Sequence, residues 1–144
     1  MNRYWLPILL LTCLANAPVC ADDMNDAGAH AYIVSPADGA TVSSPVKVIF
    51  GLSSPWGVAP AGTQVPNTGH HHLLIDTGLP DLTQAVPKDA QHRHFGGGQT
   101  EVSLELAPGS HTLQLLLGDF AHVPHDPPVM SEQITITVEE GLQE

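Results

Sequence analysis

Cysteines and basic residues are scarce in this 144-residue chain, and each shortage excludes a class of protein. The two cysteines, Cys13 and Cys20, both lie within residues 1–21, which we expect to be removed as a signal peptide. The remaining chain then has neither disulfides nor thiolate-ligated metal sites, so its stability has to come from an ordinary core. Four Lys and Arg stand against 15 Asp and Glu, a net charge of −11. Such an acidic protein is poorly suited to nucleic acid, whose phosphates need basic patches.

The N-terminal segment has the features of a secretory signal. Arg3 gives it a positive start, residues 6–14 form an apolar run too short to span a bilayer comfortably, and residues 19–21 resemble a cleavage site. Neither cysteine follows the small residue that a lipoprotein signal has, so we expect no membrane anchor after cleavage. We predict export to a bacterial periplasm, a flexible segment over 22–29, and a single domain over 30–140.

The rest of the chain has no convincing helical periodicity and alternates like a β protein. The clearest alternation is in the segment 99–106, where Val102, Leu104 and Leu106 are separated by polar residues. Turn signals rich in Pro and Gly separate the expected strands, with one more strand hidden in the connection 77–98. We therefore predict an all-β fold, an immunoglobulin-like antiparallel β-sandwich of about seven strands. The six strands that can be assigned are 30–34, 46–52, 70–76, 99–106, 111–117 and 131–138.

Nine histidines are unusually many, and three are consecutive: His70, His71 and His72. Residues two apart on a strand share a face, roughly 6.6 Å apart along the backbone. His70 and His72 are thus close enough for both rings to reach one ion. His92 and His94 have the same spacing. His71 belongs to the opposite face, where we expect it to pack or to face solvent.

The predicted topology brings distant histidines to one end of the sandwich. Strand 70–76 is expected to pair antiparallel with 111–117, so its start lies beside the loop after 117. The segment entering 99–106 lies at the same end. Three or four imidazoles suit zinc or copper(II), and Asp119 and Asp126 are candidates for a carboxylate ligand or for orienting a ring. The predicted metal ligands are His70, His72, His92, His94 and His122.

Other features fit structural roles better. His111 follows a Pro-Gly turn, where many sandwich domains carry a tyrosine that hydrogen-bonds back to that turn, so we expect it to be a structural donor. His30 and His125 are interpreted as polar loop residues. The run 96–98 is all glycine but does not join a strand to a helix as a phosphate loop does, and we expect it to give slack beside His94.

Four stretches, 69–76, 94–101, 108–115 and 122–124, occur in an order that resembles an exported bacterial family, domain-of-unknown-function family 4399. The resemblance extends over nearly the whole chain after the signal, from about residue 33 to 138. It implies no established activity. The family's motif positions match this chain at His70, His72, His94, His111 and His122.

Three functions remain open. The leading hypothesis is a periplasmic metal-binding protein for storage, delivery or sensing of copper(II) or zinc. Copper(I) would favour sulfur ligands, and only Met24 and Met130 follow the signal. The second is a metal-dependent oxidoreductase loosely like copper–zinc superoxide dismutase, although no disulfide is available and Arg93 is the only arginine near the site. The third is a non-catalytic interaction domain without metal. No protein partner can be named from the sequence.

Overall fold

Nine strands and no helix make up residues 28–140, the part of the chain that this computed structural model describes. The expected signal segment 1–21, and most of the expected flexible segment 22–29, lie outside the described residues. No described segment forms a helix capable of crossing a membrane. The strands are β1 (Ala31–Ser35), β2 (Thr41–Val42), β3 (Val46–Leu52), β4 (Gly57–Val58), β5 (Thr68–Ile75), β6 (His92–His94), β7 (Glu101–Leu104), β8 (Gly109–Gly118) and β9 (Ile134–Val138).

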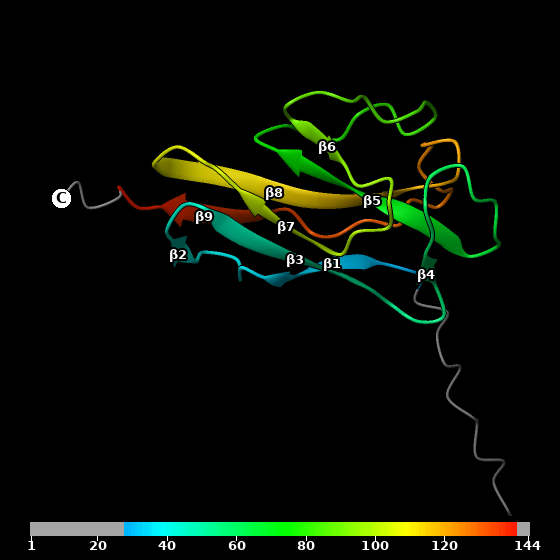
Figure 1. The fold of residues 1–144 in the computed structure, drawn as a ribbon, viewed down its shortest axis with the longest axis horizontal. Coiled ribbons are helices and arrows are strands. Elements are labelled where there is room, and N and C mark those ends of the chain that lie inside the picture. Colours follow the sequence, from blue (N-terminus) through cyan, green and yellow to red (C-terminus); the bar gives the residue numbers. More distant parts are fainter. Residues whose placement is uncertain (1–27, 141–144) are drawn as a thin grey trace, which may run out of the picture.

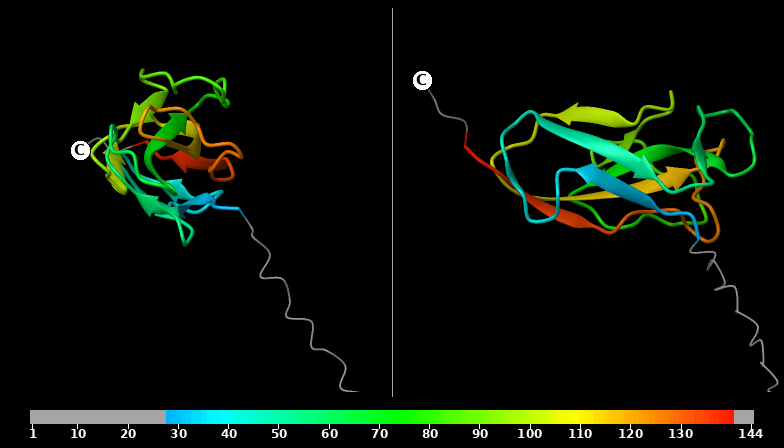
Figure 2. Two further views of the ribbon diagram at one scale, coloured as in Figure 1. Left: turned by 90° about the vertical axis from the view of Figure 1, so that its right-hand side faces the viewer. Right: turned by 90° about the horizontal axis from the view of Figure 1, so that it is seen from below.

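The strands form two sheets that face each other (Figures 1 and 2). One sheet has the order β1-β3-β7, and the other has the order β2-β9-β8-β5-β4, with β6 also paired to β5. The prediction of an all-β sandwich is confirmed. The structure adds two strands of two residues, β2 and β4, and these pair in parallel with β9 and β5, unlike the predicted antiparallel arrangement. A third short strand, β6, lies within the connection 77–98, where one more strand was expected.

The main core lies between the two sheets and follows from the alternation of the strands. Val48 and Phe50 of β3 face Leu73 of β5 and Leu115 of β8, and all four are at most 5 % exposed. Fully burying side chains of this size is worth about 1.5–3 kcal/mol each. This core holds the two sheets together and keeps β5 and β8 in the centre of the larger one.

The outer face of β5 is covered as well. Leu74 points away from the main core and packs with Leu116 and Val86 in a second, smaller cluster. Val86 belongs to the connection before β6, and its amide donates to the carbonyl of His122 in the loop after β8. These two loops cover the outer face of β5 and the main core covers its inner face, so every residue of the strand after Thr68 is buried. His70 and His72 are buried on the outer face, and His71 is buried on the inner one.

Candidate metal site

Strand pairing brings the histidines together. β5 and β8 are antiparallel, so His70 lies opposite Gly118, the last residue of β8, and the loop that follows returns His122 to the same place. β6 pairs antiparallel with the other edge of β5, and this pairing places His94 opposite His72. The predicted convergence at one end of the sandwich is therefore observed for these four rings.

The rings form a compact group. The centroids of His70, His94 and His122 are 4.7–5.0 Å apart, and that of His72 is 4.8 Å from His70 and 5.2 Å from His94. One ring nitrogen from each of His70, His94 and His122 lies within 4.8 Å of the others, so these three could hold a metal ion. Ligand nitrogens around tetrahedral zinc are about 3.3 Å apart, given Zn–N bonds of about 2.0–2.1 Å. The rings are thus close to a ligating arrangement and need only to move inward.

Most of the ring nitrogens are buried and unpaired. His70 and His72 are at most 1 % exposed, and neither nitrogen of either ring hydrogen-bonds to a described residue. The Nε2 atom of His94 is buried in the same way. A buried polar atom without a partner costs about 1–3 kcal/mol, and folded proteins leave few of them. Here several such atoms point into one group of rings, which leaves their lone pairs available to an ion.

Burial also keeps these imidazoles neutral. Burial first, and the neighbouring histidines second, lower the pKa of His70 to about 4 and that of His72 to about 3. The pKa of His94 is lowered by burial and by the nearby His122 and Lys88. A neutral imidazole is the form that binds metals. The cluster is therefore ready for metal binding at neutral pH.

Two glycines make room for the rings. A Cβ atom on Gly118 would lie 2.7 Å from Cε1 of His72, and one on Gly96 would lie 2.3 Å from Cε1 of His94. Any larger residue would have to displace a ring. Gly96 is the first residue of the glycine run that was expected to give flexibility beside His94. Its role in the structure is to let the backbone lie close to the His94 ring.

A tight turn positions His122. One oxygen of the Asp119 carboxylate accepts hydrogen bonds from the amides of Ala121 (2.8 Å) and Val123 (2.9 Å), on either side of His122. His122 has a φ of 70°, a left-handed conformation that is uncommon for residues other than glycine and is often found at functional sites. Asp119 was expected to be a carboxylate ligand or to orient a histidine ring. It orients His122, and it does so by holding the backbone of the turn that carries this residue.

A comparison with known protein families places this chain. The model of the family Domain of unknown function (DUF4399) matches residues 48–139. The chain belongs to this family. The resemblance noted in the sequence is thereby confirmed, and all four clustered histidines lie within the matched region. No curated protein and no solved structure matches the chain.

One predicted ligand of this DUF4399 protein lies apart from the other four. His92 is opposite Leu74, two residue pairs beyond the cluster, because His94 is opposite His72. Its Nδ1 atom is 2.9 Å from a carboxylate oxygen of Asp89, which also accepts a hydrogen bond from the His92 amide. The sequence showed the spacing of the pair but not the register with β5, which decides which histidine reaches the cluster.

The remaining histidines have separate environments. His71 faces the main core, where its ring centroid lies 5.3 Å from that of Phe50. Of the two expectations for His71, packing on the other strand face or facing solvent, the first is correct. His111 is the corner donor that was expected, with Nε2 2.8 Å from the Ala107 carbonyl. His30 is exposed, as is Asp126. His125 packs edge-on against Trp56 in a neighbouring pocket.

Proposed function

We propose that this DUF4399 protein is a periplasmic metal-binding protein that holds one copper(II) or zinc ion. The ligands are His70, His94 and His122, with His72 as the fourth. The observation that carries the proposal is the gathering of four histidine rings from three separate segments of the chain, with buried, unpaired ring nitrogens on His70, His72 and His94. The structural histidine His111, by contrast, has a partner for each ring nitrogen. His71 is unpaired as well, but its ring faces the main core and not the other imidazoles.

The ligand chemistry favours these two metals. The cluster offers imidazole nitrogens, which suit zinc and copper(II), whereas copper(I) carriers use sulfur ligands. Four imidazoles complete a tetrahedral zinc site, and a structural or storage site of this kind has no open position for substrate. The nearly complete burial of His70 and His72 fits such a closed site. We therefore infer binding rather than catalysis.

The dismutase-like alternative gains no support from the surroundings of the cluster. Among residues 28–140 the only arginine is Arg93, which lies between His92 and His94 on β6 and is exposed while they are half-buried. Alternation along the strand directs Arg93 away from the face that carries His94. A guanidinium placed there does not steer an anion to the cluster.

The test compares two histidines of one strand. Untagged protein is stripped with chelator and titrated with zinc and with copper(II), followed by elemental analysis for stoichiometry and by thermal unfolding for stabilisation. We expect one ion per chain. His94→Ala should weaken its affinity by about 100-fold or more, since losing an outer partner of a ligand already costs 10–100-fold.

His92→Ala is the matched control, because it removes the same ring two residues away on the same face of β6. It should leave affinity and stoichiometry unchanged. Absence of bound zinc and copper from the wild-type protein would rule out the metal function and favour the interaction-domain hypothesis. Equal losses in the two variants would contradict the placement of His92 outside the site, and no loss in either would show that the ion lies elsewhere.

A further inference from the structure

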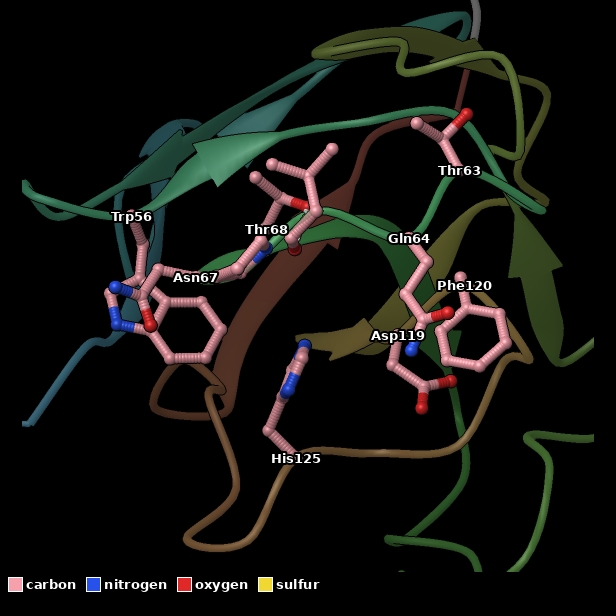
Figure 3. Close-up of a pocket in the computed structure, with 10 residues that line it drawn as sticks. Trp56, Thr63, Gln64, Asn67, Thr68, Asp119, Phe120 and His125 are labelled. Carbon is pink, nitrogen blue, oxygen red and sulfur yellow. Dashed lines mark hydrogen bonds between the residues drawn. The ribbon is translucent and has the colours of Figure 1, made fainter.

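A pocket of about 360 Å³ lies next to the histidine cluster and shares none of its residues. It is formed by the turn before β4, the segment from β4 to the start of β5, and the loop after β8 (Figure 3). Its volume is at the small end of the range for ligand-binding pockets, roughly 300–1,000 Å³. The residues that give it chemical character are Trp56, Gln64, Asn67, Asp119, Phe120 and His125.

The pocket combines aromatic surface with hydrogen-bonding groups. Figure 3 shows Trp56 and Phe120 on opposite sides, with His125 between them. Phe120 is 40 % exposed, so its ring is accessible to a ligand. The side-chain amides of Gln64 and Asn67 belong to exposed residues and can each donate and accept hydrogen bonds.

The charges of the lining narrow the ligand class. No lysine or arginine is among the lining residues that the structure describes, so a phosphate or carboxylate would find no cationic partner. Burial lowers the pKa of His125, which keeps that ring neutral at neutral pH. Asp119 carries the one formal charge, and one of its oxygens is already bonded to the backbone amides around His122.

We propose that this pocket binds a small, neutral, polyhydroxylated ligand, namely a monosaccharide. The rings of Trp56 and Phe120 pack against the apolar C–H face of the sugar. The amides of Gln64 and Asn67, together with the second oxygen of Asp119, bond its hydroxyls. A quaternary ammonium ion would use the aromatic rings and the carboxylate but would leave both amides without a partner.

The proposal is tested by calorimetric titration of the full chain with glucose, galactose, mannose and N-acetylglucosamine, with choline and glycerol phosphate as contrasting ligands. We expect at least one sugar to bind with a Kd of about 0.1–1 mM, as is reasonable for so small a ligand. Phe120→Ala should weaken that binding by about tenfold or more. Leu79→Ala is the matched control, because Leu79 is equally exposed, at 42 %, and lies outside the pocket.

Three results would overturn the proposal: no sugar binding up to 50-fold above that range (roughly 50 mM), binding of choline or glycerol phosphate in preference to every sugar, or sugar binding that Phe120→Ala leaves intact. Gln64→Ala is a second variant for the same sugar titration, and it should also weaken binding. Gln64 is exposed, so the substitution is not expected to cause misfolding. Each titration is run with metal-loaded and with chelator-treated protein. Because the pocket and the cluster have no residue in common, sugar binding should be present in both, and it stands or falls separately from the metal function.

Discussion

The ring of His72 lies against the backbone of Gly118, so that a Cβ atom on Gly118 would come within 2.7 Å of Cε1 and 3.1 Å of Nδ1 of that ring. The same added atom would lie 3.3 Å from the backbone carbon of His122. A single methyl group at Gly118 would therefore press on two members of the cluster at once.

We predict that Gly118→Ala destabilises the protein by about 1–3 kcal/mol, the usual cost of overpacking a filled interior. It should also weaken metal binding, because His72 and His122 are both displaced. Urea unfolding and metal titration measure the two effects. Gly78→Ala serves as the control, since a Cβ atom at Gly78 meets nothing within 4 Å. If both variants behave like the wild type, the close packing of His72 on Gly118 is incorrect.

The buried histidines should make the metal-free protein sensitive to acid. The pKa values of His70 and His71 are lowered to about 4 and that of His72 to about 3, mainly by burial. Between pH 6.5 and 4 the unfolded chain therefore binds protons that the folded protein does not, and stability falls as the pH falls. By pH 5 the loss is on the order of 2 kcal/mol for each of these histidines.

Denaturant unfolding in the presence of chelator, at pH 7.5 and at pH 5, measures this loss. His92→Ala should retain the full pH dependence, because that ring lies outside the buried group. Equal stability at the two pH values would contradict the burial of the three rings.

His71 provides a way to separate burial from metal binding. Its ring packs against Phe50 between the two sheets, with neither nitrogen bonded to a described residue. Replacing it by leucine removes two unpaired polar atoms from the main core. We predict that His71→Leu stabilises the protein by about 1–2 kcal/mol at pH 7, as expected when an unsatisfied group is replaced by an apolar one. Its acid sensitivity should also be smaller.

Metal affinity of His71→Leu should equal that of the wild type, because His70 and His72 point to the other face of β5. Unfolding and metal titration on the same samples check both statements. A loss of metal binding without loss of folding would mean that His71 acts on the ion, contrary to its orientation.

The β-sandwich and much of the histidine site could be predicted from the sequence, because both depend on the alternation of the strands and on their antiparallel pairing. Alternation in segments such as 99–106 indicated strands with one buried face, and antiparallel pairing then placed the start of β5 beside the end of β8. The position of His92 could not be obtained in this way. Its strand has three residues and no apolar pattern, so nothing in the sequence fixes the register in which it joins β5.

The burial of the cluster was also hidden in the sequence. It depends on the loops that carry Val86 and His122, and these loops meet through a backbone hydrogen bond rather than through a recognisable motif. The pocket at Trp56 was missed for a similar reason. Its walls come from irregular segments that have no periodicity. The only signal available was the pair of aromatic residues, Trp56 and Phe120, in loops rich in proline and glycine.

His111 should show the opposite pH dependence from the buried histidines. Its Nδ1 atom is 2.7 Å from a carboxylate oxygen of Asp76, and its Nε2 atom is 2.8 Å from the carbonyl of Ala107. Both acceptors are satisfied only when both ring nitrogens carry hydrogen, so these bonds raise the pKa of His111. The stability that this ring contributes is fully present below pH 6.5 and is lost as the pH rises through the raised value.

We predict that His111→Ala destabilises the protein by about 1–3 kcal/mol at pH 6, the range for a hydrogen bond to a charged group, and by less at pH 9. The difference in unfolding free energy between wild type and variant, measured at both pH values, removes the contribution of the other histidines. His30→Ala, at an exposed ring, should give no difference at either pH. A gap between wild type and His111→Ala that widens as the pH rises would refute the charged state of His111, because a neutral ring can donate to only one of its two acceptors.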